Sequence, residues 1–213
     1  MTLATSRRRT WVAGGILLLL SVAVGLAARG SWGDLASAKD WLFLVAVILL
    51  VVGIGRAGSV TGRRPIGSVA TVLLAIAPLT QAFWFTLMPD SAGDPHVAED
   101  TSVLFAMTYY GVVLVLAVIS VVSIVLADAL PFHWRWAPLG VLVWTPLSVG
   151  FGLMLFGATP LGTVFASIGS IVGVHGPAVG VAFLGLVAVV LGIRSRPGTD
   201  LDGRPLTEWT ERP

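Results

Sequence analysis

The sequence has 213 residues, of which 56% are hydrophobic and only 11% are charged. Soluble domains usually carry about 25% charged residues, so a chain of this composition cannot cover the surface of a water-soluble fold. Cysteine is absent, which excludes disulfides, thiolate nucleophiles and cysteine-bound metal clusters within this chain. The net charge of +2 comes from arginines near the ends of apolar segments, which fits anchoring against anionic lipid head groups better than nucleic-acid binding.

Six apolar segments approach the roughly 20 residues that a helix needs to cross about 30 Å of hydrocarbon. In chain order they run over Trp11–Ala28, Trp41–Gly55, Ile66–Met88, Ser102–Ala127, Trp136–Gly157 and Val174–Ile193. The second segment is the shortest. Only short polar stretches separate the six, so we predict an all-α, polytopic membrane helical bundle with six transmembrane helices. Residues 1–193 form its single domain, and residues 194–213 form a loosely ordered cytoplasmic tail.

The basic residues predict the orientation, because Lys and Arg in short loops stay on the cytoplasmic side of a membrane. With the N-terminus inside the cell, only Arg29 and Lys39 lie outside. The basic residues inside are Arg7, Arg8, Arg9, Arg56, Arg63, Arg64, Arg135, Arg194, Arg196, Arg204 and Arg212. We therefore expect a multi-pass protein of the cell membrane with both termini in the cytoplasm. A cleaved signal peptide is the alternative for the first segment, and it leaves five spans in the same orientation.

The stretch between Gly157 and Val174 is too apolar for an ordinary loop. Joined to the last span it makes a helix of about 50 Å, which is longer than the membrane is thick. We therefore expect a short interfacial or re-entrant helix on the outer side, with Gly173, Gly176 and Pro177 marking a break before the last span. A single, strongly tilted helix is the alternative.

Tryptophans lie at or near the ends of the six segments, where the amphipathic indole ring favours the membrane interface. These residues are Trp11, Trp32, Trp41, Trp84, Trp134 and Trp136. They support the predicted boundaries and carry no information about a ligand.

No Asp, Glu, Lys or Arg lies in the interior of any of the six segments. Ionisable groups inside a membrane mark proton relays and ion pathways, so their absence argues against an ion-coupled pump, a voltage sensor or a retinal protein. The three histidines, His96, His133 and His175, are not paired deep within the segments as a di-haem cytochrome requires. We expect no bound cofactor.

Four polar residues fall in the outer halves of the third and fourth segments. They are Gln81, Thr86, Tyr109 and Tyr110. In this position they are candidates for the lining of a ligand pocket that opens outward. The alternative is that they form hydrogen bonds between helices and serve packing.

The outer loop Met88–Asp100 contains four carboxylates and a histidine within a dozen residues. Imidazole and carboxylate are common ligands of divalent metals, and a bound metal can activate water against a lipid ester or amide. The candidate metal ligands are Asp90, Asp94, His96 and Glu99, joined by His175 from the start of the last span. An acidic outer loop is also what solubility alone produces.

The stretch Arg64-Pro65-Ile66-Gly67, followed by Met88-Pro89-Asp90 and then His96, resembles a six-span family of bacteria and archaea known as domain of unknown function 998. Members of that family carry an Arg-Pro pair before the third span, an aromatic-Pro pair with an acid, and a His before the fourth span. Met88 replaces the aromatic residue here. The resemblance covers about residues 60–130 and implies no established activity; it makes Pro89, Asp90 and His96 the first positions to test.

These observations favour a non-enzymatic protein, either a transport element or a lipid- or small-molecule-binding element that is not driven by buried ion-coupling residues. The alternatives are an accessory or anchor subunit of a larger membrane complex and a metal-dependent membrane hydrolase with its site on the outer face. The expected partners are membrane lipids, together with another membrane protein or a second copy of the chain. Nucleic acid is not an expected partner.

Overall fold

A computed structural model describes residues 3–29, 35–53, 65–87, 95–127, 130–131, 133–158 and 164–194. The regular structure of these residues is helical. Its elements are α1 (Leu3–Ala28), α2 (Ala36–Val52), α3 (Pro65–Thr86), α4 (Pro95–Leu126), α5 (Ala137–Ala158) and α6 (Val164–Arg194). The predicted cytoplasmic tail, apart from Arg194 at the end of α6, lies outside the described residues.

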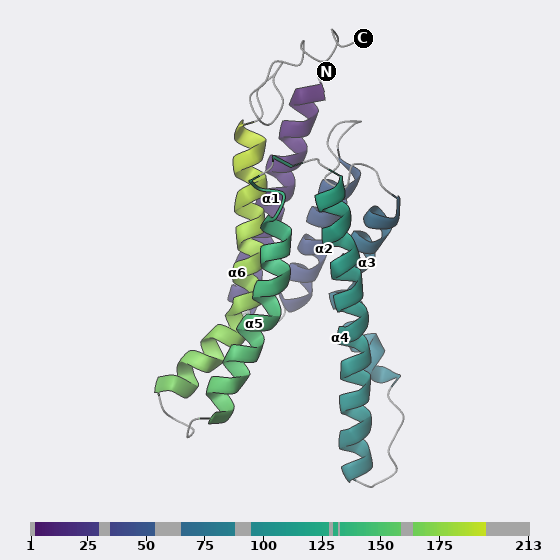
Figure 1. The fold of residues 1–213 in the computed structure, drawn as a ribbon, viewed down its shortest axis with the longest axis vertical. Coiled ribbons are helices and arrows are strands. Elements are labelled where there is room, and N and C mark those ends of the chain that lie inside the picture. Colours follow the sequence, from purple (N-terminus) through teal and green to yellow (C-terminus); the bar gives the residue numbers. More distant parts are fainter. Residues whose placement is uncertain are drawn as a thin grey trace.

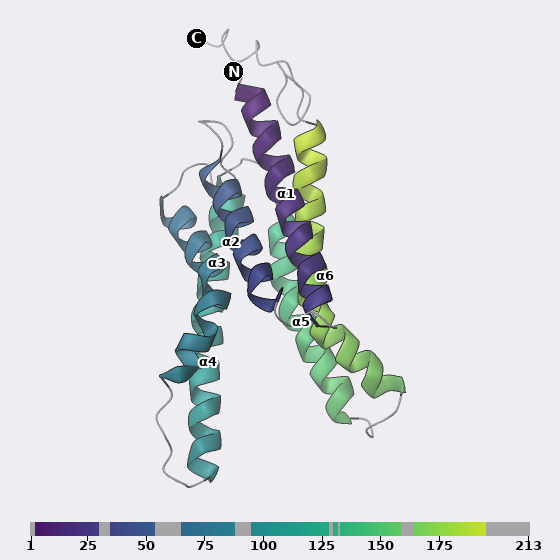
Figure 2. The same ribbon diagram turned by 180° about the vertical axis from the view of Figure 1, so that it is seen from behind.

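Successive helices run in alternating directions, so that the beginning of α1 and the end of α6 lie at the same end of the molecule (Figure 1). Neighbours in space follow the order α4, α3, α2, α1, α6, α5, and only a slight contact between α4 and α5 closes this ring. At the opposite end, the α3–α4 pair and the α5–α6 pair diverge, which both views show (Figures 1 and 2). The bundle is therefore tight around α1 and α6 and open between its two outer pairs.

Five of the helices are long and apolar enough to cross a membrane, namely α1, α3, α4, α5 and α6. The sixth, α2, has 17 residues and a length of about 25 Å. Large apolar side chains cover the outside of these helices, as in Ile66 at 75% exposure and Met154 at 71%. An apolar exterior of this extent is stable only in contact with lipid or another apolar surface. The all-helical membrane fold expected from the sequence is confirmed at this level.

Glycines let α1 pack closely against α6. A Cβ atom at Gly15 would lie 2.7 Å from the carbonyl oxygen of Gly185, so only glycine permits this approach of the two helices. Beside this contact, Val187 and Leu191 of α6 pack in a buried cluster with Trp11. Trp11 is only 3% exposed, so it is a core residue and not the interfacial anchor that its sequence position predicts.

The contact between α5 and α6 is also built from small residues. A Cβ at Gly152 of α5 would lie 2.5 Å from the Cα of Gly173, and Gly176 packs against the side chain of Ser148. The indole Nε1 of Trp144 donates a hydrogen bond of 2.8 Å to the carbonyl oxygen of Gly176. Van der Waals packing between closely spaced backbones and interhelical hydrogen bonds both stabilise the association of membrane helices.

The expected short helix before the last span is wrong, because Val164–Arg194 forms one continuous α-helix with Pro177 inside it. Pro177 has no N–H to donate to Gly173, yet the helix continues as a bend, which is visible in α6 in Figure 1. Gly173 and Gly176 contact α5 instead of ending a helix. Because of the bend, the first part of α6 stays packed along α5, and the helix continues without interruption.

Candidate functional site

Aromatic side chains gather where α3 meets α4. The Tyr109 ring lies 6.3 Å from the rings of both Trp84 and Phe85, and 5.2 Å from Tyr110 in an edge-on arrangement. The Trp84 ring also lies 6.0 Å from that of Phe105. These separations fall in the range of favourable aromatic pairs. The outer half of the α3–α4 pair is therefore held by a packed aromatic cluster.

Two hydrogen bonds reinforce this cluster across the helix pair. The Tyr109 hydroxyl donates to the carbonyl oxygen of Ala77 at 2.8 Å, and the Trp84 Nε1 donates to the carbonyl oxygen of Phe105 at 3.3 Å. Ala77 directly precedes Pro78, which lies inside α3. Backbone carbonyls near a proline in a membrane helix commonly accept such side-chain hydrogen bonds. Both polar aromatic groups thus bind the backbone of the neighbouring helix.

The four predicted pocket residues lie on α3 and α4 in different surroundings. Tyr109 is buried, Gln81 is half-buried, and Tyr110 and Thr86 are exposed. The Thr86 hydroxyl donates to the carbonyl oxygen of Phe83 in its own helix. The structure brings Tyr109 and Tyr110 together, and their contact with each other is aromatic packing. Ligand binding by the four residues stays a prediction.

A second polar cluster lies at the C-terminal end of α1, and its members are far apart in the sequence. The Nη1 of Arg29 lies 2.9 Å from the Nδ1 of His175 on α6. Because the guanidinium can only donate, Nδ1 is the acceptor and the ring proton of a neutral His175 is on Nε2. Arg29 and His175 are 146 positions apart in the chain, so only the packing of α1 on α6 joins them.

Lys39, in the first turn of α2, approaches the same end of α1. A Cβ at Gly25 would lie 3.2 Å from the Lys39 Cδ, and Gly25 is one helical turn before Arg29. The Lys39 ammonium lies 3.7 Å from the carboxylate of Asp40. Asp40 in turn is close enough to Tyr109 on α4 to interact with it electrostatically. Polar residues from four helices are therefore concentrated at this level of the bundle.

The candidate metal ligands are only partly visible. Asp90 and Asp94 lie outside the described residues, and His96 and Glu99 belong to the first turns of α4 with side chains that are not described. Among the described side chains, no group of three or more His, Asp or Glu is close enough to hold a metal. The described parts of α4 and α6 make no contact, and His175 bonds to Arg29. Metal binding by the outer loop stays a prediction.

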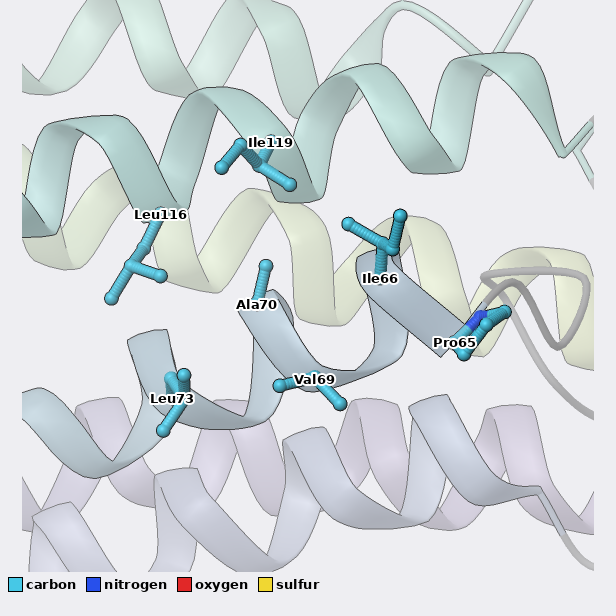
Figure 3. A pocket seen from close by; sticks show the side chains of 7 residues that line it. All are labelled: Pro65, Ile66, Val69, Ala70, Leu73, Leu116 and Ile119. Carbon is cyan, nitrogen blue, oxygen red and sulfur yellow. The ribbon is translucent and has the colours of Figure 1, made fainter.

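An open apolar groove runs between the other halves of α3 and α4 (Figure 3). Its volume is about 380 Å³. The lining consists of Pro65, Ile66, Val69, Ala70 and Leu73 from α3 and Leu116 and Ile119 from α4. No polar side chain lines the groove. These side chains offer a polar ligand no hydrogen-bond partner, so the groove suits only an apolar occupant.

Several Ser and Thr hydroxyls within the helices donate to the backbone of their own helix. Thr71 donates to the Gly67 carbonyl oxygen, and Thr145 donates to that of Val141. The same pattern holds for Thr80, Thr108, Ser120 and Ser148. A hydroxyl bonded in this way is satisfied without water or ligand. These side chains therefore form no polar path through the described part of the bundle.

The length and composition of the described helices are those of a helical integral membrane protein. The chain matches no protein-family model, and neither curated proteins nor solved structures give a significant match.

Proposed function

We propose that the chain is a non-enzymatic, lipid-binding protein of the cell membrane that crosses the bilayer six times with both ends in the cytoplasm. The beginning of α1 and the end of α6 lie at the same end of the molecule, which supports an even number of crossings. The eleven-to-two distribution of basic residues supports this orientation, since 13 Lys and Arg residues are present and only Arg29 and Lys39 belong to the opposite side. In this arrangement α2 crosses with its flanking residues in a locally thinner bilayer.

The apolar groove between α3 and α4 is the observation that carries the lipid-binding proposal. Its lining is entirely apolar, and Ile66, Val69 and Leu73 expose 75%, 57% and 47% of their surfaces along it. A flexible acyl chain gains van der Waals contact in such a groove without losing hydrogen bonds. Ion-coupled transport finds less support, because Thr71, Ser120 and Thr145 donate their hydroxyl hydrogen bonds within their own helices.

Filling the groove tests this proposal. The purified protein is incorporated into lipid nanodiscs that contain a phospholipid with a diazirine on its acyl chain, and labelled peptides are mapped by mass spectrometry. In the wild-type protein we expect labelling concentrated on the groove segments of α3 and α4. Val69→Trp should reduce it severalfold, because the indole occupies the groove.

Val143→Trp on α5 is the matched control, because Val143 is 50% exposed but lies outside the groove. This variant should leave the labelling of α3 and α4 unchanged. Uniform labelling of all exposed helices, or equal effects of the two tryptophans, would contradict the lipid-binding proposal. Thermal unfolding of each variant in detergent shows that both fold.

An accessory subunit is the second candidate, and the exposure of α4 favours it. Only 6% of the apolar window of α4 is buried, against 39% for α6, and a Cβ at Gly111 would meet nothing within 4 Å. A helix uncovered to this degree has room for a partner helix. Purification at native expression level in a mild detergent distinguishes the candidates, since a chain that migrates alone contradicts the subunit hypothesis. Membership of the six-span family of unknown function likewise remains a hypothesis.

A further inference from the structure

We propose that Arg29, Lys39 and His175 form a binding site for a phosphate group, carried by a lipid head group or free in solution. Arg29, directly after α1, contacts His175 of α6, and the Lys39 side chain of α2 passes Gly25, one turn before Arg29. This site is separate from the apolar groove, whose lining belongs to α3 and α4. The inference therefore does not depend on lipid occupying that groove.

Arg29 supplies a positioned donor. Its Nη1 is held by His175 at 2.9 Å, which orients the planar guanidinium, while the side chain remains exposed. A guanidinium carries further N–H groups in a fixed fork that matches two oxygens of a phosphate. The hydrogen bond to His175 thus prepares Arg29 for a bidentate contact without using up its donors.

Lys39 supplies a second cation near the same end of α1. Its stem passes Gly25, one turn before Arg29 on α1, and its side chain is 45% exposed. The distance of 3.7 Å to the Asp40 carboxylate is longer than a charge-assisted hydrogen bond of about 2.7–2.9 Å. The ammonium therefore keeps donors for another acceptor, although Asp40 offsets part of its charge.

The N-terminal end of α2 adds a weaker attraction for an anion. No acidic residue lies in its first turn, and Leu35 at the N-cap provides no side-chain hydrogen bond. Lys39 therefore stands at the positive end of a helix dipole, where a cation is unfavourable and an anion is favoured. Among the described side chains at this end of α1, Arg29 and Lys39 against Asp40 leave a net positive charge, which suits a singly charged phosphodiester.

The test measures phosphate binding by the full chain in a neutral detergent. Native mass spectrometry records retained dioleoylphosphatidylglycerol from mixed micelles, with dioleoylphosphatidylcholine as the zwitterionic reference. A separate thermal-shift titration uses inorganic phosphate. The double variant Arg29→Gln/Lys39→Gln should lower the binding of whichever probe binds by about tenfold, since each lost contact is a hydrogen bond to a charged group.

Arg194→Gln is the matched control, because it removes one positive charge at the other end of α6. It should leave binding unchanged. Loss with phosphatidylglycerol alone identifies a lipid head group, and loss with inorganic phosphate as well identifies a site open to soluble anions. His175→Gln tests the same site if the double variant does not fold, and should also weaken binding. Binding of neither probe, or equal losses in the Arg194 and Arg29/Lys39 variants, would overturn the proposal.

Discussion

At Gly152 the backbones of α5 and α6 approach each other so closely that no side-chain atom fits between them. A Cβ there would lie 2.5 Å from the Cα of Gly173 and 2.6 Å from the carbonyl oxygen of Gly169. Both are backbone atoms, so they cannot rotate away as a flexible side chain would. Gly150, two positions earlier in the same helix, has no atom within 4 Å of its Cβ position. The two glycines therefore serve different purposes.

We predict that Gly152→Ala destabilises the protein by about 1–3 kcal/mol, because the methyl group forces the helices apart. Gly150→Ala should change the stability by no more than about 0.5 kcal/mol, because its methyl group meets open space. Reversible unfolding in detergent with increasing dodecyl sulfate measures both values. Equal stabilities of the two variants would show that α5 and α6 are not in contact at Gly152.

The Tyr109 hydroxyl links α4 to the backbone of α3. Tyr109→Phe removes the 2.8 Å hydrogen bond to the Ala77 carbonyl oxygen and keeps the aromatic packing with Trp84 and Phe85. Hydrogen bonds between membrane helices contribute about 0.6 kcal/mol on average, so a loss of this order is expected in the same unfolding assay. Tyr110→Phe is the control, since Tyr110 is 57% exposed, and it should have the smaller effect.

The contacts of Trp11 and Arg29 could not be predicted from the sequence. Trp11 has the position of an interfacial anchor and is instead buried against Leu191, because α1 crosses α6 at that point. Arg29 was assigned only to the outer side, and its contact with His175 depends on the same crossing. Both outcomes depend on which helices are neighbours, and the apolar pattern of a single span does not indicate which helix it will contact.

Among the helices, α6 is the centre of the bundle and α4 is its periphery. Glycines line two sides of α6, with Gly169 and Gly173 facing α5 and Gly185 and Gly192 facing α1. By contrast, α4 packs on α3 and barely touches α5. Because local stability follows the density of buried contacts, the helices should not open with equal ease.

Hydrogen–deuterium exchange in detergent micelles tests this difference. We expect backbone amides of α4 to exchange faster than those of α1 and α6, since few residues of α4 are buried by neighbours. The comparison uses peptides from the apolar middle of each helix, so that micelle coverage is similar. Faster exchange in α6 than in α4 would contradict the described packing.

The positions of the helices were largely predictable, because each apolar segment found in the sequence overlaps one helix of the structure over most of its length. The exception is the segment before the last span. Gly173, Gly176 and Pro177 read as a helix break, but their small size lets α5 approach, and the missing hydrogen bond is accommodated by a bend. The sequence alone does not distinguish a glycine that ends a helix from one that allows close helix packing.

For the molecule as a whole, the order of helices around the bundle was not predictable. Loop lengths favour contacts between consecutive helices, yet α1 packs extensively on α6, at the far end of the chain. That contact creates the cluster of Arg29, Lys39 and His175. The predicted outer pocket residues and the acidic loop were selected by polarity alone, so the sequence found Tyr109 and His175 but not their partners Ala77 and Arg29.

Cysteine labelling tests whether the chain crosses the membrane six times with both ends in the cytoplasm. The natural sequence has no cysteine, so single substitutions report without background. In intact cells, a membrane-impermeant maleimide should label Ser31→Cys and Ser91→Cys. It should reach Ser59→Cys and Ser195→Cys only after the membrane is permeabilised. Labelling of Ser31→Cys and Ser59→Cys from the same side would show that α2 does not cross the membrane and would contradict the six crossings.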